Sequence, residues 1–547
     1  MNSMAISAQA GTRTRIGAVR SWPEWGVLVV YSALIAFMIP YHEPWADEAQ
    51  AWLLARDLSP WQLLHTNLRY EGSPAIWHLL LWVLIRLRVS YTGMHWISGL
   101  IAIGGIYLLL FLSPFPRWLK LSLPFTVFFA FQYAIVARSY VLVPILVFAV
   151  AAAWRRNAVV VALLLGLLAN VTAHGAAIAA GFGIAYLVER YVRRRRGEPV
   201  SSPAHFRIAV VIFVSLGIIA VLTAFPTPDV KNANPPHRDF IGSGLMALLF
   251  GMWQPMELGI IGWGLMIWGL TRRRVPHLLI PALVLVLFSA AVYVTYWHAG
   301  LLVVVMTAVL WISWPRETAP LHAAEIAMQC AVAVLIATQV GWTVHAAWYD
   351  HFHDYSPGKR TAAFLAPYVR AGVPIAVTYG KGTSYHVVGI QPYFPRNIFV
   401  NQPNSFYFWS RSNHVAADFP ATLAEHPGII LVEGQVYNAS AAEDGADLSD
   451  PALASSLRSI EEHGYRRDRI FCAIKPERFA YRESVCFFVM MSITLQPPLI
   501  DSPDRHSAGK HPPPGDPHTN KIGNGTLGHV LTRAGVRPIN RDTPFKD

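Results

Sequence analysis

Long apolar runs separated by short polar segments dominate the chain up to about residue 345. The first run is WGVLVVYSALIAFMIPY, residues 25–41. Because a helix needs about 20 mainly apolar residues to cross a bilayer, we expect about 11 to 13 transmembrane helices. The candidate spans are residues 25–41, 75–92, 94–112, 119–136, 140–154, 158–173, 175–189, 206–225, 241–271, 277–296, 299–314 and 321–346.

The pattern changes after residue 349, where short alternating apolar segments replace the long runs. The segments PIAVTYG, GIILVEG, DRIFCAI and SVCFFVMM are typical of strands, and DPALASSLRSIEEHG is typical of a helix. Residues 349–493 are therefore predicted to form a small α/β domain. Residues 494–547 are rich in proline and polar residues, which predicts a disordered tail.

Composition supports a membrane protein. Hydrophobic residues make up 54% of the 547 residues and charged residues 14%, whereas soluble domains carry about 25% charged residues. The fold class expected is thus an α-helical polytopic membrane protein with a small C-terminal extracytoplasmic α/β domain.

The net charge of +12 does not indicate nucleic-acid binding, because the basic residues lie in clusters beside the predicted spans. Lysine and arginine are retained in cytoplasmic loops, so these clusters mark the inner face. We expect no nucleic-acid partner. The clusters are Arg13, Arg15 and Arg20, then Arg193 to Arg196, then Arg272 to Arg274.

The orientation follows from these clusters. The first apolar run lacks a small-residue cleavage site, so residues 1–24 are expected to stay cytoplasmic and the loop 42–74 to lie outside. Counting spans from the Arg193 to Arg196 cluster places residues after 349 outside as well. The order of the early spans stays open, because the arginines at 138, 155 and 156 cannot all lie inside.

Acidic residues gather where the first span ends, in YHEPWADEAQAWLLARD. Asp47 and Glu48 can simply solvate and cap a helix end, or they can line a pocket. If this segment is helical, the two side chains point about 100° apart, so only one is expected to face a reacting group. The amphipathic stretch that follows ends with Arg69 and Glu71, directly before a Gly-Ser-Pro break.

A sparse set of polar residues interrupts the later spans. Arg138 lies between two apolar runs, beside Tyr140, and a guanidinium there can hold a lipid phosphate or extend to the nearest headgroups. His174 in VTAHG and His298 in WHAGLL lie in smooth apolar sequence, where they can hydrogen-bond between helices or line a site. Polar residues in spans mark functional cavities by default, so one shared cavity is expected.

The chain has three cysteines, too few for a disulfide-dense scaffold or a four-cysteine zinc site. Cys330 lies in a predicted span. Cys472 and Cys486 lie on neighbouring predicted strands of the outer domain. A disulfide between them and two unpaired buried thiols are both compatible with the sequence.

The segments ADEAQAWLLARDLS, RYEGSPAIWHLLLW, ARSYVLVPILVF, TAHG and HAGLL, in this order and spacing, resemble the bacterial GT-C membrane glycosyltransferases. This group is related to glycosyltransferase family 39, the protein O-mannosyltransferases and the lipid A aminoarabinose transferases. The resemblance covers residues 25–345. It implies a polyprenyl-phosphate sugar donor, an acceptor of unknown identity, and an active site at the outer face of a bacterial inner, or cell, membrane.

Carried to matching positions, the resemblance implies that Asp47 is the general base, Glu48 its acidic partner and Arg138 a phosphate-binding group. An oxygen-liganded Mg²⁺ or Mn²⁺ held by the two acids is conceivable, but the loop offers few further ligands and we expect no obligatory metal. The predicted substrate-binding residues are Arg69, Glu71, Arg138, Tyr140, His174 and His298.

Two positions depart from the family pattern. Relatives often have histidine and proline after an acid or lysine, whereas Ser73 follows Glu71 and Gly72 here. Trp297 replaces the arginine that often precedes the equivalent of His298. A transporter of lipid-linked sugars or a membrane scaffold are the alternative functions. Both would tolerate loss of Asp47, and many transporters have inverted repeats, which this sequence does not show.

Overall fold

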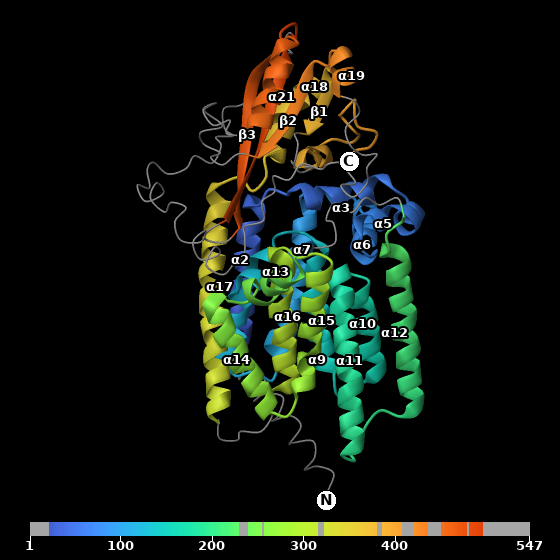
Figure 1. Ribbon diagram of the computed structural model, residues 1–547, viewed down its shortest axis with the longest axis vertical. Helices are drawn as coiled ribbons and strands as arrows, with labels where there is room; N and C mark the ends of the chain where they lie inside the picture. The colour runs from blue at the N-terminus through green and yellow to red at the C-terminus, as the bar shows by residue number, and fades with distance from the viewer. Residues whose placement is uncertain are drawn as a thin grey trace, which may run out of the picture.

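The structure is a computed structural model, and it describes residues 21–228, 239–253, 256–315, 322–379, 386–406, 419–435, 450–477 and 481–495. The chain forms a helical bundle with an α/β domain at one end (Figure 1). Both parts agree with the fold class expected from the sequence.

Within the described ranges, five helices are long and apolar enough to cross a membrane, so the chain is an integral membrane protein. These helices are α2 (Trp22–Met38, extended by η1, Ile39–Tyr41), α7 (Gly93–Leu112), α12 (Pro203–Ala224), α16 (Tyr296–Ser313) and α17 (Ala323–Phe352).

Shorter apolar helices fill the rest of the bundle, together with the two helices α11 (Ala173–Arg195) and α14 (Met256–Arg272). The exact number of spans, 11 to 13 in our prediction, stays a prediction. The shorter helices are α6 (Ile76–Arg86), η5 and α9 (Ser139–Val141, Leu142–Ala153), α10 (Ala158–Ala169), α13 and η6 (Phe240–Leu245, Met246–Phe250), and η7 and α15 (Pro276–Leu279, Ile280–Ala291).

Two predicted spans are not continuous helices. The segment 119–136 divides into α8 (Arg117–Ser122), η3 (Leu123–Phe125) and η4 (Phe128–Gln132). Pro124 accounts for the first break, because proline has no backbone N–H to donate to the carbonyl group of the preceding turn. The segment 241–271 divides after Phe250, where Gly251 packs so closely on the backbone of Ala299 that a side chain would overlap it.

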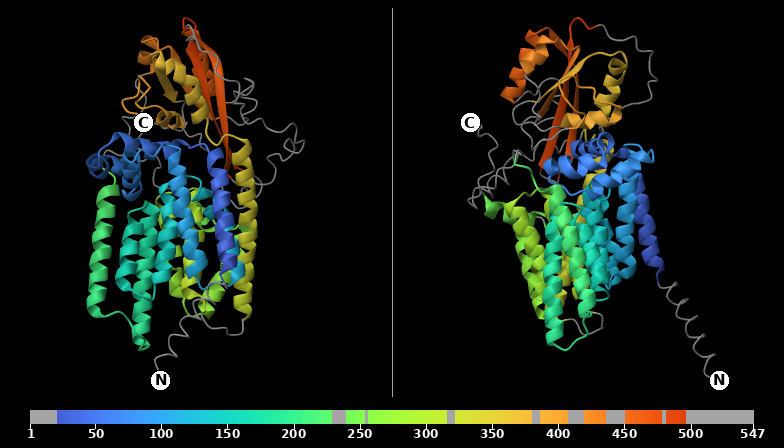
Figure 2. Two further views of the ribbon diagram at one scale, coloured as in Figure 1. Left: turned by 180° about the vertical axis from the view of Figure 1, so that it is seen from behind. Right: turned by 90° about the vertical axis from the view of Figure 1, so that its right-hand side faces the viewer.

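The loop after the first span folds into helices that lie across the end of the bundle, beneath the α/β domain (Figures 1 and 2). The bounds are α3 (Ala46–Asp57), α4 (Pro60–Gln62), η2 (Leu63–Asn67) and α5 (Leu68–Glu71). Gly72 turns the chain with a φ of +59°, a conformation that glycine adopts without the steric cost of a Cβ.

The basic cluster at Arg193 to Arg196, where α11 ends, lies at the end of the bundle remote from α3 (Figure 1). This separation matches the sequence-based expectation that the acidic loop and the basic loop lie on opposite faces of the bilayer. Which face is cytoplasmic stays a prediction.

The α/β domain has a sheet of order β1-β2-β4-β3, in which β1 and β2 are parallel and the other pairs antiparallel. All four predicted strand segments are confirmed. The strands are β1 (Ile375–Tyr379), β2 (Ile429–Gln435), β3 (Tyr465–Glu477) and β4 (Tyr481–Ser492).

Helices cover both faces of the sheet because its strands alternate between two apolar clusters. Ile429 and Leu431 pack with α18 (Gly358–Arg370) and η8 (His386–Tyr393). Ile430 and Val432 pack on the other face with α19 (Phe419–Ala424) and α21 (Pro451–Glu462), the helix expected from the sequence.

Cys472 on β3 and Cys486 on β4 are directly opposite in register and form a disulfide. Of the two arrangements that the sequence left open, the structure has the bonded one. Cys330 is a free cysteine in α17. The disulfide joins β3 and β4, so it stabilises the α/β domain.

We expect thiol alkylation of the denatured, unreduced protein to modify Cys330 alone, and alkylation after reduction to modify all three cysteines. The Cys472→Ser/Cys486→Ser variant should lower the free energy of unfolding of the α/β domain by about 2–4 kcal/mol, the usual contribution of a native disulfide. Intact-mass spectrometry and pulse proteolysis measure the two effects. Three alkylated cysteines without reductant would contradict the pairing.

Candidate active site

The two adjacent acids in the first turn of α3 have different surroundings. The Asp47 carboxylate forms an ion pair with the Arg138 guanidinium, and their side chains are 14% and 25% exposed. Glu48 is fully buried. Successive residues of a helix point about 100° apart, and the structure agrees with the expectation that only one acid faces the accessible side.

Four donors surround the Glu48 carboxylate. His95 Nε2 lies 2.8 Å from Oε1 and His42 Nε2 lies 3.4 Å from Oε2. The backbone N–H groups of Ala137 and Trp45 donate to the same carboxylate at 2.6 and 3.0 Å. Burial alone would raise the pKa of Glu48, but the charges and hydrogen bonds of His95 and His42 outweigh it and hold the pKa well below its usual range.

The remaining ring nitrogens of the two histidines also face oxygen acceptors. His42 Nδ1 lies 3.2 Å from both carboxylate oxygens of Asp350, near the end of α17. His95 Nδ1 lies 3.3 Å from the carbonyl oxygen of Thr92. The cluster therefore connects the loop after α2 with α3, α7 and α17.

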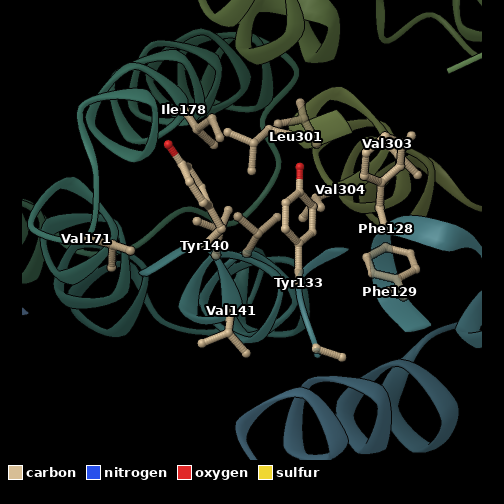
Figure 3. Packing of buried hydrophobic residues seen from close by; sticks show 14 of the residues in the cluster. Phe128, Phe129, Tyr133, Tyr140, Val141, Val171, Ile178, Leu301, Val303 and Val304 are labelled. Atoms are coloured by element: carbon tan, nitrogen blue, oxygen red, sulfur yellow. The ribbon is translucent and has the colours of Figure 1, made fainter. Parts of the chain in front are cut away.

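The chain segment that carries Arg138 continues into a second polar group. The Tyr140 hydroxyl lies 2.6 Å from His298 Nε2, and the Thr295 hydroxyl and backbone N–H lie 2.8 and 3.2 Å from His298 Nδ1. Figure 3 shows Tyr133 and Tyr140 side by side in an apolar cluster, with both hydroxyls pointing to the same side. The tyrosine hydroxyls thus place polar groups within a cluster of apolar side chains.

His174 stacks on His298 with ring centroids 4.1 Å apart and planes 7° apart. His174 Nε2 also lies 3.0 Å from the carbonyl oxygen of Tyr293. The glycine of the HAG segment has a packing role, because a Cβ on Gly300 would overlap the Phe128 ring. These contacts link six of the predicted site residues into one continuous group: Asp47, Glu48, Arg138, Tyr140, His174 and His298.

Arg69 and Glu71 have partners outside that group. Arg69 Nε donates to the carbonyl oxygen of Leu222 at 3.3 Å, which ties α5 to α12. Glu71 Oε1 accepts a hydrogen bond from the Gln50 amide at 2.7 Å. Burial raises the pKa of Glu71 to about 7, although the Gln50 hydrogen bond acts in the opposite direction. Their roles in substrate binding stay predictions.

The α/β domain packs on α3 through η8. Arg56, near the end of α3, donates to the carbonyl oxygen of Phe394 at 2.7 Å, and Asp57 accepts a hydrogen bond from Ser405. The Tyr355 backbone N–H donates to the Glu43 carboxylate at 2.9 Å. The domain is therefore fixed to both ends of the loop segment that carries Asp47.

The sequence analysis missed His42, His95 and Asp350, the partners of the buried carboxylate. Each lies at the end of an apolar run, where polar residues usually contact headgroups or water. For His42 and Asp350 a signal was available, since both follow predicted spans that end on the outer side; the predicted spans 75–92 and 94–112 would place His95 on the opposite side. The two acids named as possible Mg²⁺ or Mn²⁺ ligands have different partners, with Asp47 on Arg138 and Glu48 on the histidines.

Chemically, this end of the bundle combines a carboxylate that can accept a proton with a guanidinium that can bind an anion. Both are partly exposed, while the surrounding side chains are mainly buried. A carboxylate is a suitable general base, and arginine binds phosphate through a fixed fork of N–H donors.

Among solved structures, the chain is similar to the crystal structure of ArnT from Cupriavidus metallidurans bound to undecaprenyl phosphate, with a TM-score of 0.49 and 14% identity over 84% of this chain and 97% of that chain. No family model and no curated protein matches the chain.

The pKa of Glu71 predicts a pH-dependent stability. An unfolded glutamate has a pKa of about 4.3, whereas the pKa of Glu71 in the folded protein is about 7. Between these two pH values, the native state therefore binds more protons than the unfolded state. Stability should therefore fall as pH rises from 5 to 8. In the Glu71→Gln variant, the free energy of unfolding should fall by about 1–2 kcal/mol less over this pH range, a value reduced because Glu71 is partly exposed to solvent.

Thermal unfolding of the wild type and Glu71→Gln at pH 5 and pH 8 measures the difference. Glutamine has a side-chain oxygen at the position of Glu71 Oε1, so the hydrogen bond from Gln50 is retained. Parallel pH dependences of the two proteins would show that Glu71 titrates as an ordinary surface acid.

Proposed function

We propose that this protein is a glycosyltransferase that moves a sugar from a polyprenyl-phosphate donor to an acceptor at the outer face of the membrane. The observation that carries the proposal is the Asp47–Arg138 pair at the end of the bundle, because it combines a base with a phosphate-binding group. The family resemblance of the surrounding motifs supports the same reaction.

In the proposed reaction, an acceptor hydroxyl oxygen attacks C1 of the sugar as the bond from C1 to the phosphate oxygen breaks. The hydroxyl proton passes to the Asp47 carboxylate, and the negative charge of the leaving polyprenyl phosphate is stabilised by Arg138. Burial of Glu48 leaves Asp47 as the accessible acid of the pair. A single carboxylate favours direct displacement with inversion at C1.

The ion pair suggests an order of binding. In the absence of donor, Arg138 and Asp47 form an ion pair with each other. A phosphate that enters competes for the guanidinium and leaves the carboxylate able to accept a proton. The donor should therefore bind before the acceptor is activated, which protects the base from unproductive contacts.

Tyr140 is suited to add a hydrogen bond to the phosphate. The backbone N–H of Thr295 donates to His298 Nδ1, so a neutral His298 carries its proton on Nε2. This Nε2–H donates to the Tyr140 oxygen. Tyr140, which lies two residues after Arg138 in the chain, therefore keeps its own hydroxyl hydrogen for another acceptor.

We also propose that this face is extracytoplasmic, in a bacterial inner membrane. Two features support this orientation. The Cys472–Cys486 disulfide is typical of an oxidising compartment. The arginine cluster at the opposite end of the bundle fits the cytoplasmic side.

Asp47→Asn should lower the rate of sugar transfer by about 10² to 10⁴, because it removes the general base. Arg138→Gln should weaken the binding of polyprenyl phosphate, while Asp47→Asn should leave it unchanged or tighten it, because the competing carboxylate is gone. Purified protein is supplied with a panel of polyprenyl-phosphate sugars and cell-envelope extract. Mass spectrometry follows product and released polyprenyl phosphate.

Asp57→Asn is the matched control, since it neutralises the acid at the other end of α3. It should keep near wild-type transfer. Equal turnover by the wild type and Asp47→Asn would exclude Asp47 as the base. Translocation of lipid-linked sugar that survives loss of Asp47 would indicate a transporter instead.

A further inference from the structure

Three buried side chains from different parts of the chain converge at one point beneath α3. His42 follows the first span, Glu48 is in the first turn of α3, and His95 is in the first turn of α7. One ligand atom from each, a histidine ring nitrogen or a carboxylate oxygen, lies within 4.8 Å of the other two. The three residues are at most 5% exposed.

The acceptors around His42 and His95 outnumber the N–H groups that two neutral imidazole rings supply. All four ring nitrogens of His42 and His95 face oxygens that can only accept, namely those of Glu48, Asp350 and the Thr92 carbonyl. A neutral imidazole has only one N–H, so two neutral histidines cannot serve four acceptors. Additional protons in the cluster, or a cation between Glu48 and the two rings, would complete these contacts.

The outer partners are those that histidine ligands of metal ions use. In metal sites, the ring nitrogen remote from the ion usually donates to a carboxylate or a backbone carbonyl, which fixes the tautomer and the ring orientation. His42 Nδ1 has the Asp350 carboxylate, and His95 Nδ1 has the Thr92 carbonyl. Both rings therefore direct Nε2 towards Glu48.

We propose that His42, Glu48 and His95 bind one divalent transition-metal ion of the zinc class. Two imidazoles and one carboxylate form a donor set common for Zn²⁺, whereas Mg²⁺ and Ca²⁺ prefer oxygen ligands. With neutral histidines, the charge of the ion balances the carboxylates of Glu48 and Asp350. The charge count is then the same as for two imidazolium rings.

Tyr91 is a further polar group of this region. It precedes His95 by about one helical turn, and its hydroxyl is buried without a hydrogen-bond partner among the described residues. The hydroxyl is also near enough to Glu48 for an electrostatic interaction with its carboxylate. A water molecule bound by both Tyr91 and the ion would provide the fourth ligand that zinc usually has.

The ion would position the active site without contacting substrate. It would fix Glu48, whose Oε1 accepts the N–H of Ala137, the residue before Arg138. It would also tie α3 to α7 and, through Asp350, to α17. The three residues are thus positioning residues, and Asp47 and Arg138 remain the reacting pair.

The test measures the metal content of the full-length protein, purified in detergent after growth with added Zn²⁺ or Co²⁺. We expect about one ion per chain, the stoichiometry of a single site, and d–d absorption bands in the Co²⁺ form. His95→Gln and Glu48→Gln should lose most of the metal. His78→Gln, which changes a buried histidine of α6 outside the cluster, should keep it.

A second measurement applies to the wild type alone, so it does not depend on whether the variants fold. Removal of the ion by a chelator should lower the midpoint of thermal unfolding, and Zn²⁺ should restore it whereas Mg²⁺ should not. A protein that contains no metal after growth with Zn²⁺, and whose unfolding responds to neither chelator nor Zn²⁺, would show that protons hold the cluster. Neither measurement uses a sugar donor, so the transferase proposal is tested separately.

Discussion

The buried carboxylate of Glu48 is the interaction on which the end of the bundle depends. A charge removed from water is costly unless opposite charges and hydrogen bonds replace the lost solvation. Here that replacement comes from two histidines and two backbone N–H groups, which lie in separate parts of the chain. The carboxylate therefore fixes α3 and the segment before Arg138 relative to each other. The position of the guanidinium is a consequence of this arrangement, since Ala137 is its neighbour in the chain.

Helix geometry gives the adjacent acids separate roles. One residue along α3 rotates the side chain by about 100°, so Glu48 points into the bundle while Asp47 faces the accessible side. The buried acid has neighbours that keep it ionised and immobile. The accessible acid has the Arg138 guanidinium as a cationic partner. An Asp-Glu sequence at a helix start thus provides both a buried support and an accessible acid.

Parts of this arrangement could be predicted from the sequence because they depend on local pattern. The alternating segments gave the four strands, and the apolar runs gave most helices. Asp47 and Arg138 could be named by chemistry and resemblance, but their contact could not, because a single sequence does not reveal contacts between distant positions. His42 and Asp350 are 308 residues apart, and neither is unusual at the end of a span. The breaks at Pro124 and Gly251 also escaped the hydropathy pattern, since the runs stay apolar while close packing and proline determine the backbone.

The position of Asp47 at the start of a helix also bears on how it would act as a base. The first turn of a helix carries a partial positive charge, and Arg138 adds a full one. Both are favourable neighbours for an ionised carboxylate. A donor phosphate bound to Arg138 would offset the charge of the guanidinium, and the carboxylate would then attract a proton more strongly. Donor binding would therefore create the base as well as supply the leaving group. An acceptor that enters without donor would meet a carboxylate still held by arginine.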